Sequence, residues 1–224
     1  SVNELVDVYG SKERALQDAA MMEPTAVPYN GIFTRGGGIK PGNHVAVFGA
    51  GPIGLSAISL VRAAGAAKII SFEPVPERQE LAKKVGADIV LDPDELTAQG
   101  ISLGEKVMEL TGGIGVGMAV EATHHQAITI PEIEKMMAVG GTIAQIGIYP
   151  EVTPVMSSPL QKKGINYHFS IGSSGHGIWQ NVIRLIAAGR IDPSKFLTRC
   201  YPLEEAVEAI ETAAKCRVGK VVIT

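Results

Sequence analysis

The sequence is poor in cysteine, in aromatic residues and in long apolar runs. Its two cysteines, Cys200 and Cys216, match no metal-binding spacing, so two reduced thiols are expected. The longest apolar runs have the length of strands, which argues against a transmembrane helix and a membrane partner. The 20 basic residues are scattered and nearly balance 23 acidic ones, which argues against nucleic acid as a partner.

The remaining composition is that of a soluble globular protein. Hydrophobic residues make up 46% of the 224 residues and the net charge is −3, which fits one or two domains. The first residues, Ser1-Val2-Asn3-Glu4, have neither the charged nor the apolar region of a secretory signal. A cytoplasmic location is therefore expected.

One segment combines a buried strand with a glycine-rich turn. Residues 45–48 predict the strand, and Gly49, Gly51 and Gly54 follow it in the spacing G-x-G-x-x-G. In dinucleotide sites the first glycine allows a sharp turn, the second admits a pyrophosphate, and the third lets helix and strand pack closely. The helix that starts near Ile53 offers free N–H groups and a positive dipole end to phosphates. The alternative is a glycine-rich turn of an ordinary parallel sheet.

A second strand, residues 68–72, ends in an acidic residue, Glu73, nineteen residues after Gly54. An acid at this spacing accepts hydrogen bonds from the ribose hydroxyls of NAD and repels the 2′-phosphate of NADP. NAD is therefore the expected cofactor. Arg78 follows five residues later and either stacks on the adenine or is solvated.

Strand and helix patterns alternate through the middle of the chain. Strands are expected at residues 45–48, 69–72, 89–91, 118–120, 142–146 and 166–171. Helices are expected at residues 53–64, 77–85, 103–110 and 131–139. This order predicts an α/β fold with a doubly wound parallel sheet of six strands, the Rossmann arrangement. The C-terminal ends of all strands then share one edge, where the ligand crevice opens.

The two flanks of this region have other patterns. Residues 4–22 predict a charged lead-in helix that ends at Glu23-Pro24. A glycine- and serine-rich loop at 173–177 is followed by an amphipathic helix to residue 188, a helix at 203–215 and a strand at 218–223. The last strand has no place in the dinucleotide sheet and suggests an edge of another domain.

Further ordered blocks run from about Ala20 to the end of the chain. They are Met22-Glu23-Pro24, Ile39-Lys40-Pro41-Gly42, the glycine turn, Val85-Gly86-Ala87-Asp88, Val120-Glu121-Ala122-Thr123, Val139-Gly140-Gly141-Thr142, Ile146-Gly147, Tyr201-Pro202-Leu203-Glu204-Glu205-Ala206 and Gly219-Lys220-Val221-Val222-Ile223. In these blocks the chain resembles the medium-chain dehydrogenase/reductase family, most closely its zinc-dependent sorbitol and threonine dehydrogenase branch. It departs at His124, where glycine is commoner, and at Asn43-His44, where an acid usually follows the glycine. We expect His124 to reshape the adenine-side loop.

The resemblance implies an NAD-dependent oxidoreductase that transfers a hydride between a polyol, sugar or secondary alcohol and the nicotinamide, with zinc in the full-length enzyme. Because a zinc-bearing domain precedes this region in the family, the chain is expected to be the C-terminal part of a longer enzyme and inactive alone. Residues 1–24 would end the catalytic domain, 25–171 form the NAD-binding domain, and 172–224 return to the catalytic domain. Two alternatives stay open, a stand-alone dinucleotide-binding module without catalysis and a zinc-free quinone reductase relative.

The resemblance also assigns roles to residues. It places Glu23 near the zinc, as a ligand or through a water; the alternative is a carboxylate that satisfies local backbone N–H groups at a helix start. It brings Lys220 to the pyrophosphate, although a solvated lysine is the alternative. The expected cofactor-binding set is Gly49, Gly51, Pro52, Ile53, Gly54, Glu73, Arg78, Glu121, Ala122, Thr123, Ile146, Gly147, Ile148, Phe169, Ile171 and Lys220. Pairing of the sixth strands, residues 165–171, would join two copies into a homodimer or homotetramer.

Overall fold

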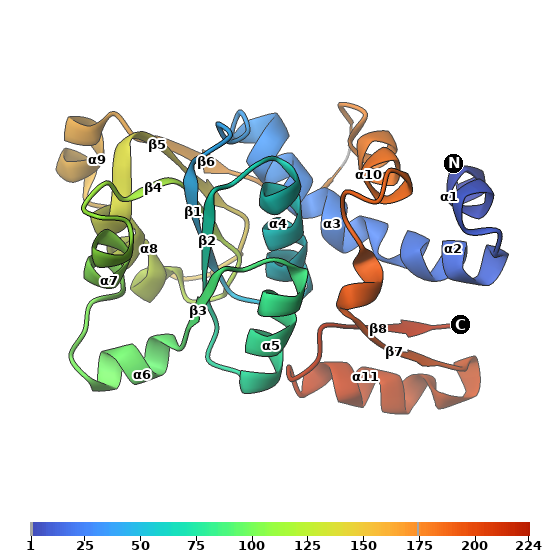
Figure 1. Ribbon diagram of the computed structural model, residues 1–224. Coiled ribbons are helices and arrows are strands. Elements are labelled where there is room, and N and C mark those ends of the chain that lie inside the picture. Colours follow the sequence, from blue (N-terminus) through green and yellow to red (C-terminus); the bar gives the residue numbers. More distant parts are fainter. Residues whose placement is uncertain (1, 174) are drawn as a thin grey trace.

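The computed structural model describes residues 2–173 and 175–224; Ser1 and Ser174, the latter from the expected 173–177 loop, lie outside the described residues. Its centre is a parallel six-stranded sheet in the order β3-β2-β1-β4-β5-β6 (Figure 1). The strands are β1 (His44–Phe48), β2 (Lys68–Phe72), β3 (Ile89–Leu91), β4 (Val116–Glu121), β5 (Met137–Gln145) and β6 (Asn166–Phe169). The predicted doubly wound α/β fold is confirmed.

Helices cover both faces of this sheet. One face carries α4 (Pro52–Ala63) and α5 (Pro76–Val85); the other carries α7 (Leu103–Leu110) and α8 (Gln126–Met136), and the short helices α6 (Pro93–Ala98) and α9 (Ser157–Lys163) lie in connections. Alternate residues of a strand enter opposite cores: Val45 and Val47 pack with α4, whereas Ala46 and Phe48 pack with α7 and α8. Burial on both faces explains why residues 45–48 of β1 are continuously apolar. Among the described residues, no helix is long and apolar enough to cross a lipid bilayer.

The fourth expected helix, at 131–139, is wrong at both ends. Helix α8 begins five residues earlier, at Gln126, and ends at Met136, so that residues 137–139 open strand β5. The apolar residues 136–139 suit a helix or a buried strand equally well, and periodicity alone cannot separate the two. Pairing with β4 decides, because Met137 aligns with Val116. At the edge of the sheet, β6 ends at Phe169 and not at residue 171.

The lead-in segment is longer and more broken than expected. Helices α1 (Val2–Tyr9) and α2 (Lys12–Ala20) are separated by Gly10, whose φ is +63°, and the Ser11 side chain caps α2. The expected end of the helical segment at Glu23-Pro24 is wrong, because a helix continues through Pro24. Helix α3 (Met22–Tyr29) has Pro24 in its first turn, where a missing N–H costs little, and continues into the π-helical turn η1 (Asn30–Arg35).

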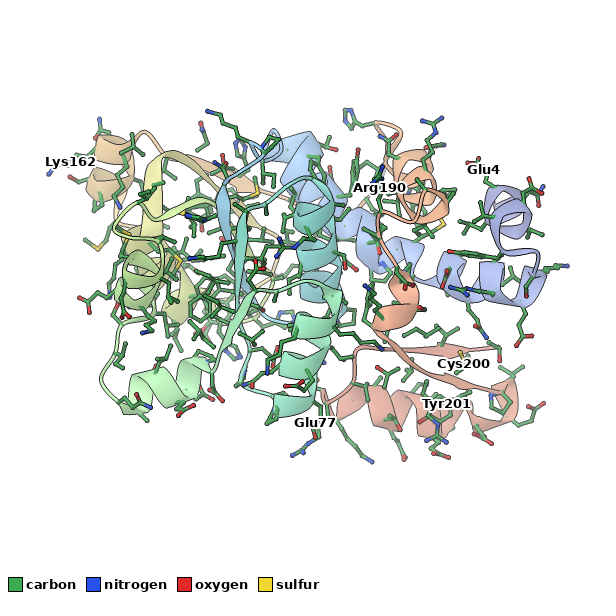
Figure 2. All side chains as sticks on the ribbon, viewed as in Figure 1. Glu4, Glu77, Lys162, Arg190, Cys200 and Tyr201 are labelled. Atoms are coloured by element: carbon green, nitrogen blue, oxygen red, sulfur yellow. The ribbon has the colours of Figure 1, made fainter. Side chains whose placement is uncertain are left out.

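The C-terminal residues form a separate small layer. Helix α10 (Ile178–Ala187) and the turn η2 (Pro193–Lys195) lead to a parallel two-stranded sheet of β7 (Leu197–Tyr201) and β8 (Lys220–Ile223), with η3 (Leu203–Glu205) and α11 (Ala206–Ala214) between them. The last strand, β8, therefore lies outside the main sheet, as expected. Its partner strand β7 was not predicted from the sequence. Tyr201 is buried beneath α11, and its hydroxyl lies 3.0 Å from Oγ1 of Thr212 (Figure 2). An ion pair of 3.2 Å between Arg217 and Glu77 ties this layer to α5.

Candidate dinucleotide-binding site

The three glycines of the turn after β1 have different geometric roles. Gly49 has φ of +88°, a region that residues with a side chain rarely adopt. A Cβ atom on Gly54 would collide with the carbonyl oxygen of Gly49, so α4 packs directly on the end of β1. Gly51 has ordinary backbone angles (φ −70°, ψ −178°), and a Cβ atom there would meet only Nη1 of Arg78, at 3.9 Å. The fold thus requires the first and third glycines, whereas the second opens onto free space beside a guanidinium group.

The start of α4 faces this free space. Pro52 is the first residue of the helix and Gly51 is its N-cap, with no side-chain hydrogen bond to the first turn. The N–H groups of a first helical turn have no acceptor within the helix, and the helix dipole adds positive potential there. An uncapped helix start next to Arg78 fits a bound pyrophosphate.

Glu73 reaches the same turn from the end of β2. Its carboxylate accepts hydrogen bonds from the backbone N–H of Ala50, at 2.6 Å, and of Val75, at 3.0 Å. The residue is only 3% exposed, so packing fixes the orientation of the carboxylate. The carboxylate is the acceptor in both hydrogen bonds. Each of its oxygens keeps a further lone pair that can accept a hydrogen bond from a ribose hydroxyl. The residues present therefore fit the adenosine half of a dinucleotide.

Arg78 joins the glycine turn to the C-terminal layer. Its Nε donates to the carbonyl oxygen of Val218 at 3.1 Å, while its Nη1 approaches Gly51. Lys220 lies two residues beyond Val218, at the start of β8, and its backbone N–H bonds to Phe196. The C-terminal segment thus passes close to the turn. Among the described residues, none forms a hydrogen bond or ion pair with the Lys220 ammonium group.

A cavity of about 280 Å³ opens at the C-terminal edge of the sheet. It is lined by Glu23, Val27, Ile53, Ala122, His124, Ile146, Gly147, Ile148, Ile171 and Gly172. The structure thus brings together Glu23, from α3, and six expected cofactor residues from α4 and from the loops after β4, β5 and β6. Sequence reasoning missed Val27, which follows Glu23 by one helical turn, and it did not place Gly172 or His124 in the cofactor-binding set.

Phe169 and Glu121, which the sequence assigned to the cofactor at the ends of β6 and β4, do not line this cavity. The ring of Phe169 stacks on Tyr167, with centroids 4.8 Å apart, and remains 68% exposed. The carboxylate of Glu121 is fully buried and accepts hydrogen bonds from Thr123 N (3.0 Å), Gln126 Nε2 (2.5 Å) and Thr129 Oγ1 (3.3 Å). Burial raises the pKa of Glu121, against the effect of these donors. Its side chain therefore organises the loop after β4.

His124 lies at a different end of the site from the one expected. The sequence placed it by the adenine, but the structure places it in the cavity wall, with Nδ1 2.8 Å from the carbonyl oxygen of Ile148. The strand order supplies the reason: β1 separates β4 from β2, which carries Glu73, whereas β5 is the neighbour of β4. The loop after β4 consequently contacts the loop after β5.

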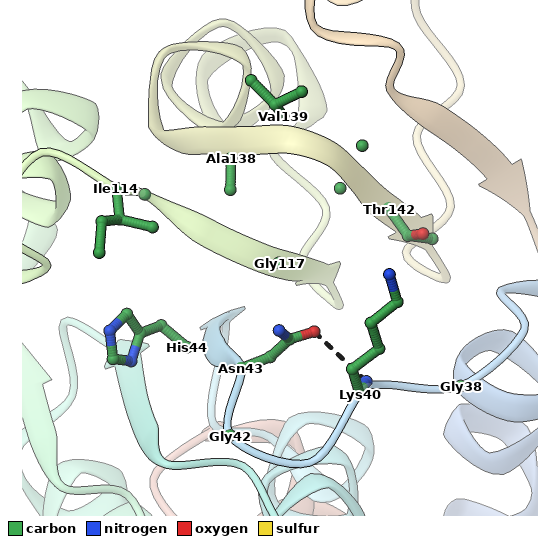
Figure 3. Close-up of a pocket in the computed structure, with 13 residues that line it drawn as sticks. Gly38, Lys40, Gly42, Asn43, His44, Ile114, Gly117, Ala138, Val139 and Thr142 are labelled. Atoms are coloured by element: carbon green, nitrogen blue, oxygen red, sulfur yellow. Dashed lines mark hydrogen bonds between the residues drawn. The ribbon is translucent and has the colours of Figure 1, made fainter.

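A second cavity of about 270 Å³ lies at the opposite edge, where β1, β4 and β5 begin (Figure 3). Its walls are rich in glycine backbone, and the side chains of Lys40, His44 and Thr142 border it. Asn43 Oδ1 accepts a hydrogen bond from the Lys40 backbone at 3.3 Å. None of the expected cofactor residues lines this cavity, and ligands of open α/β sheets bind at the carboxyl ends of strands. The first cavity is therefore the candidate site.

The described residues do not form a complete zinc centre. Among residues 2–173 and 175–224, no group of three or more His, Cys, Asp or Glu side chains could hold a metal ion. A catalytic zinc takes three protein ligands, and Glu23 is the one acidic residue that lines the cavity. The residues described do not by themselves fit this metal.

Comparison with known proteins identifies the family. The sequence profile described as "Zinc-binding dehydrogenase" matches residues 52–188, which is more than half of the chain. The chain therefore belongs to the zinc-binding dehydrogenase family, and the resemblance read from the sequence blocks is confirmed.

Individual relatives match 93% or more of this chain. A scyllo-inosose 3-dehydrogenase from Thermotoga maritima is 35% identical over 215 residues, 94% of this chain and 53% of the relative. A solved structure from the same organism, named as an alcohol dehydrogenase, has a TM-score of 0.91 and 34% identity, covering 100% of this chain and 56% of that one. A structure named as a short chain alcohol dehydrogenase from Escherichia coli CFT073, complexed with NADH, has a TM-score of 0.80 and 26% identity over 93% and 59% of the two chains. The chain thus spans little more than half the length of these relatives.

Proposed function

We propose that this chain is the cofactor-binding part of an NAD-dependent dehydrogenase that acts on a polyol, sugar or secondary alcohol. The Thermotoga maritima scyllo-inosose 3-dehydrogenase supports the polyol class, and the NADH complex of the Escherichia coli relative supports the cofactor. The observation that carries the proposal is the Glu73 carboxylate, held at Ala50 beside the open position of Gly51.

The two ends of this glycine turn bind different parts of NAD. The pyrophosphate lies over Gly51 at the start of α4, where Arg78 and, on the C-terminal strand, Lys220 supply positive charge. Glu73 accepts hydrogen bonds from the adenosine ribose, and its negative charge disfavours the 2′-phosphate of NADP. The site therefore selects NAD.

The nicotinamide occupies the cavity at the ends of β4, β5 and β6. Ile53 and Ile146 give it apolar walls that exclude water from the reacting face. Backbone groups at 146–148 and 169–171 orient the carboxamide. NAD supplies the hydride-accepting carbon, and the protein supplies position and electrostatics.

Glu23 is the acidic group that this chain contributes to the reacting end of the cavity. We assign it to the surroundings of the catalytic zinc, whose other ligands come from outside the described residues. Its position in the first turn of α3 also favours a negative charge through the helix dipole. No step of the reaction is assigned to the metal from these residues alone.

The edge of the sheet supports the proposed assembly. Among the described residues, no strand pairs with the outer side of β6, and Phe169 and Ile171 are 68% and 77% exposed. Uncovered edge strands favour pairing with another chain, so we assign this edge to a two-fold contact between copies. A monomer in analytical ultracentrifugation would contradict the assignment.

Calorimetric titration of the chain with NAD and NADP tests the cofactor assignment. We expect NAD to bind at least about tenfold more tightly, which corresponds to about 1.4 kcal/mol. Equal affinities or a preference for NADP would contradict the role of Glu73 and favour the quinone reductase alternative. Absence of binding by either nucleotide would contradict the function altogether.

A further inference from the structure

His124 lies between the two regions that the proposed function assigns to NAD. The residue before it, Thr123, adjoins the glycine turn: a Cβ atom on Gly49 would lie 3.1 Å from Thr123 Cγ2. On its other side His124 contacts Ile148, and both residues line the cavity. A dinucleotide carries its second ribose between the pyrophosphate and the nicotinamide. A cofactor that runs from the glycine turn into the cavity therefore passes this ribose along His124.

The hydrogen bond to the Ile148 carbonyl indicates which ring nitrogen of His124 carries a proton. A carbonyl oxygen only accepts, so Nδ1 of His124 carries the proton in this 2.8 Å contact. A neutral ring protonated at Nδ1 has a lone pair on Nε2. Within the described part of the chain, no group donates to Nε2. His124 thus offers a hydrogen-bond acceptor at the exposed wall of a largely apolar cavity.

We propose that His124 binds the nicotinamide-side ribose. Its Nε2 accepts a hydrogen bond from a ribose hydroxyl while its Nδ1–H donates to the Ile148 carbonyl oxygen. The inference rests on the proposed function and adds a residue to it. The family resemblance places glycine more commonly at this position, and glycine has no side chain for such a contact. The contact would therefore distinguish this chain from relatives that carry the glycine.

A pair of ligands that differ in the second ribose tests the proposal. ADP ends at the pyrophosphate, whereas ADP-ribose carries the second ribose without the nicotinamide. Loss of one hydrogen bond between neutral groups should weaken ADP-ribose and NAD roughly three- to tenfold in His124→Ala and leave ADP binding unchanged. His125→Ala is the matched control, because His125 is exposed and does not line the cavity.

Two further substitutions separate the two nitrogens. His124→Asn keeps a donor for Ile148 but has no acceptor at the Nε2 position, so it should lose as much ADP-ribose affinity as His124→Ala. His124→Gln reaches the Nε2 position with an amide oxygen and should recover part of the affinity. Recovery by the asparagine and not by the glutamine would overturn the proposal in favour of a role through Ile148 alone.

Proton–nitrogen correlation spectra of the histidine side chains give an independent readout. We expect the Nδ1-protonated tautomer of His124 in the free chain, and a shift of its Nε2 resonance on addition of ADP-ribose but not of ADP. An Nε2-protonated ring, or equal losses for ADP and ADP-ribose in His124→Ala, would overturn this inference. If the unmodified chain bound neither ADP nor NAD, the proposed function would be overturned instead.

Discussion

The carboxylate of Glu73 accepts a 2.6 Å hydrogen bond from the backbone N–H of Ala50 and so connects the end of β2 to the turn after β1. Ala50 lies between the first two glycines of that turn. The acid that we assign to the ribose therefore also holds the turn to which we assign the pyrophosphate. Substitution of Glu73 should consequently affect cofactor affinity and the stability of the turn together.

Replacement of Glu73 by serine should weaken NAD binding roughly ten- to a hundredfold, because a charge-assisted hydrogen bond contributes about 1.5–3 kcal/mol. NADP should bind better than before, since the negative charge facing its 2′-phosphate is gone. Calorimetric titration measures both affinities. Glu73→Gln is the matched control: it keeps an acceptor oxygen for Ala50 without the charge, so its melting temperature should fall less. Unchanged NAD affinity in Glu73→Ser would remove the ribose assignment.

Replacement of Gly51 by valine should abolish NAD binding and leave the melting temperature nearly unchanged. The backbone angles of Gly51 are ordinary, and its Cβ position is open except for Arg78 at 3.9 Å, so the side chain fits the free protein. The same side chain occupies the space that the pyrophosphate needs. Nucleotide titration and thermal melting check the two halves of this prediction.

Gly54→Val is the control for Gly51→Val. Its Cβ atom would collide with the Gly49 carbonyl, so this variant should melt far lower or fail to fold. If Gly51→Val retained NAD affinity at an unchanged melting temperature, the glycine turn would be merely structural.

The glycine turn, Glu73 and the succession of strands and helices along the chain were predictable because each depends on residues close in the sequence. The strand at 45–48, the turn and the acid after the next strand form one local unit whose pattern is visible in the chain. The boundary between α8 and β5 could not be predicted, because the apolar residues 136–139 fit both a helix and a strand. Strand β7 was missed because Thr198 and Arg199 are exposed and interrupt the apolar pattern.

The contact of His124 with Ile148 lies beyond what a sequence pattern can show. The two residues are 24 positions apart and belong to loops after different strands. They meet because β4 and β5 are neighbours in the sheet, which the alternation of helices and strands does not specify. The departure from glycine at His124 marked the position, but only the structure shows that His124 lines the cavity together with Ile148.

Glu134 should contribute less to the free energy of unfolding at neutral pH than in mild acid. The residue is 4% exposed on α8; one oxygen accepts from Met156 N at 2.8 Å, and the other has no partner among the described residues. Burial raises its pKa, so the folded state binds this proton more tightly than the unfolded state does. The contribution of Glu134 to stability therefore rises as the pH falls from the raised folded pKa toward the ordinary unfolded one.

Glu134→Gln isolates this effect from Asp18 and Glu121, whose pKa values burial also raises. The amide keeps an oxygen for Met156 and removes the buried charge, so the variant should melt a few degrees higher at pH 7; about 1 kcal/mol corresponds to roughly 2–4 °C at this size. The difference should shrink in mild acid. Glu132→Gln on the same helix should melt lower, because Glu132 pairs with Lys135. A lower melting temperature for Glu134→Gln at pH 7 would contradict the prediction.

The 224-residue chain alone should bind NAD but oxidise no alcohol or polyol. Hydride transfer needs the alcohol carbon held about 3–3.5 Å from the nicotinamide, and we assign the described residues to the cofactor side of that arrangement. Glu23 provides one acidic group where a catalytic zinc needs three protein ligands. Formation of NADH, followed by absorbance with a panel of polyols, should stay at background, whereas the same residues joined to a zinc-bearing domain should show a rate that chelators remove. Turnover by the chain alone in the presence of EDTA would refute the zinc-dependent assignment and support a metal-free reductase.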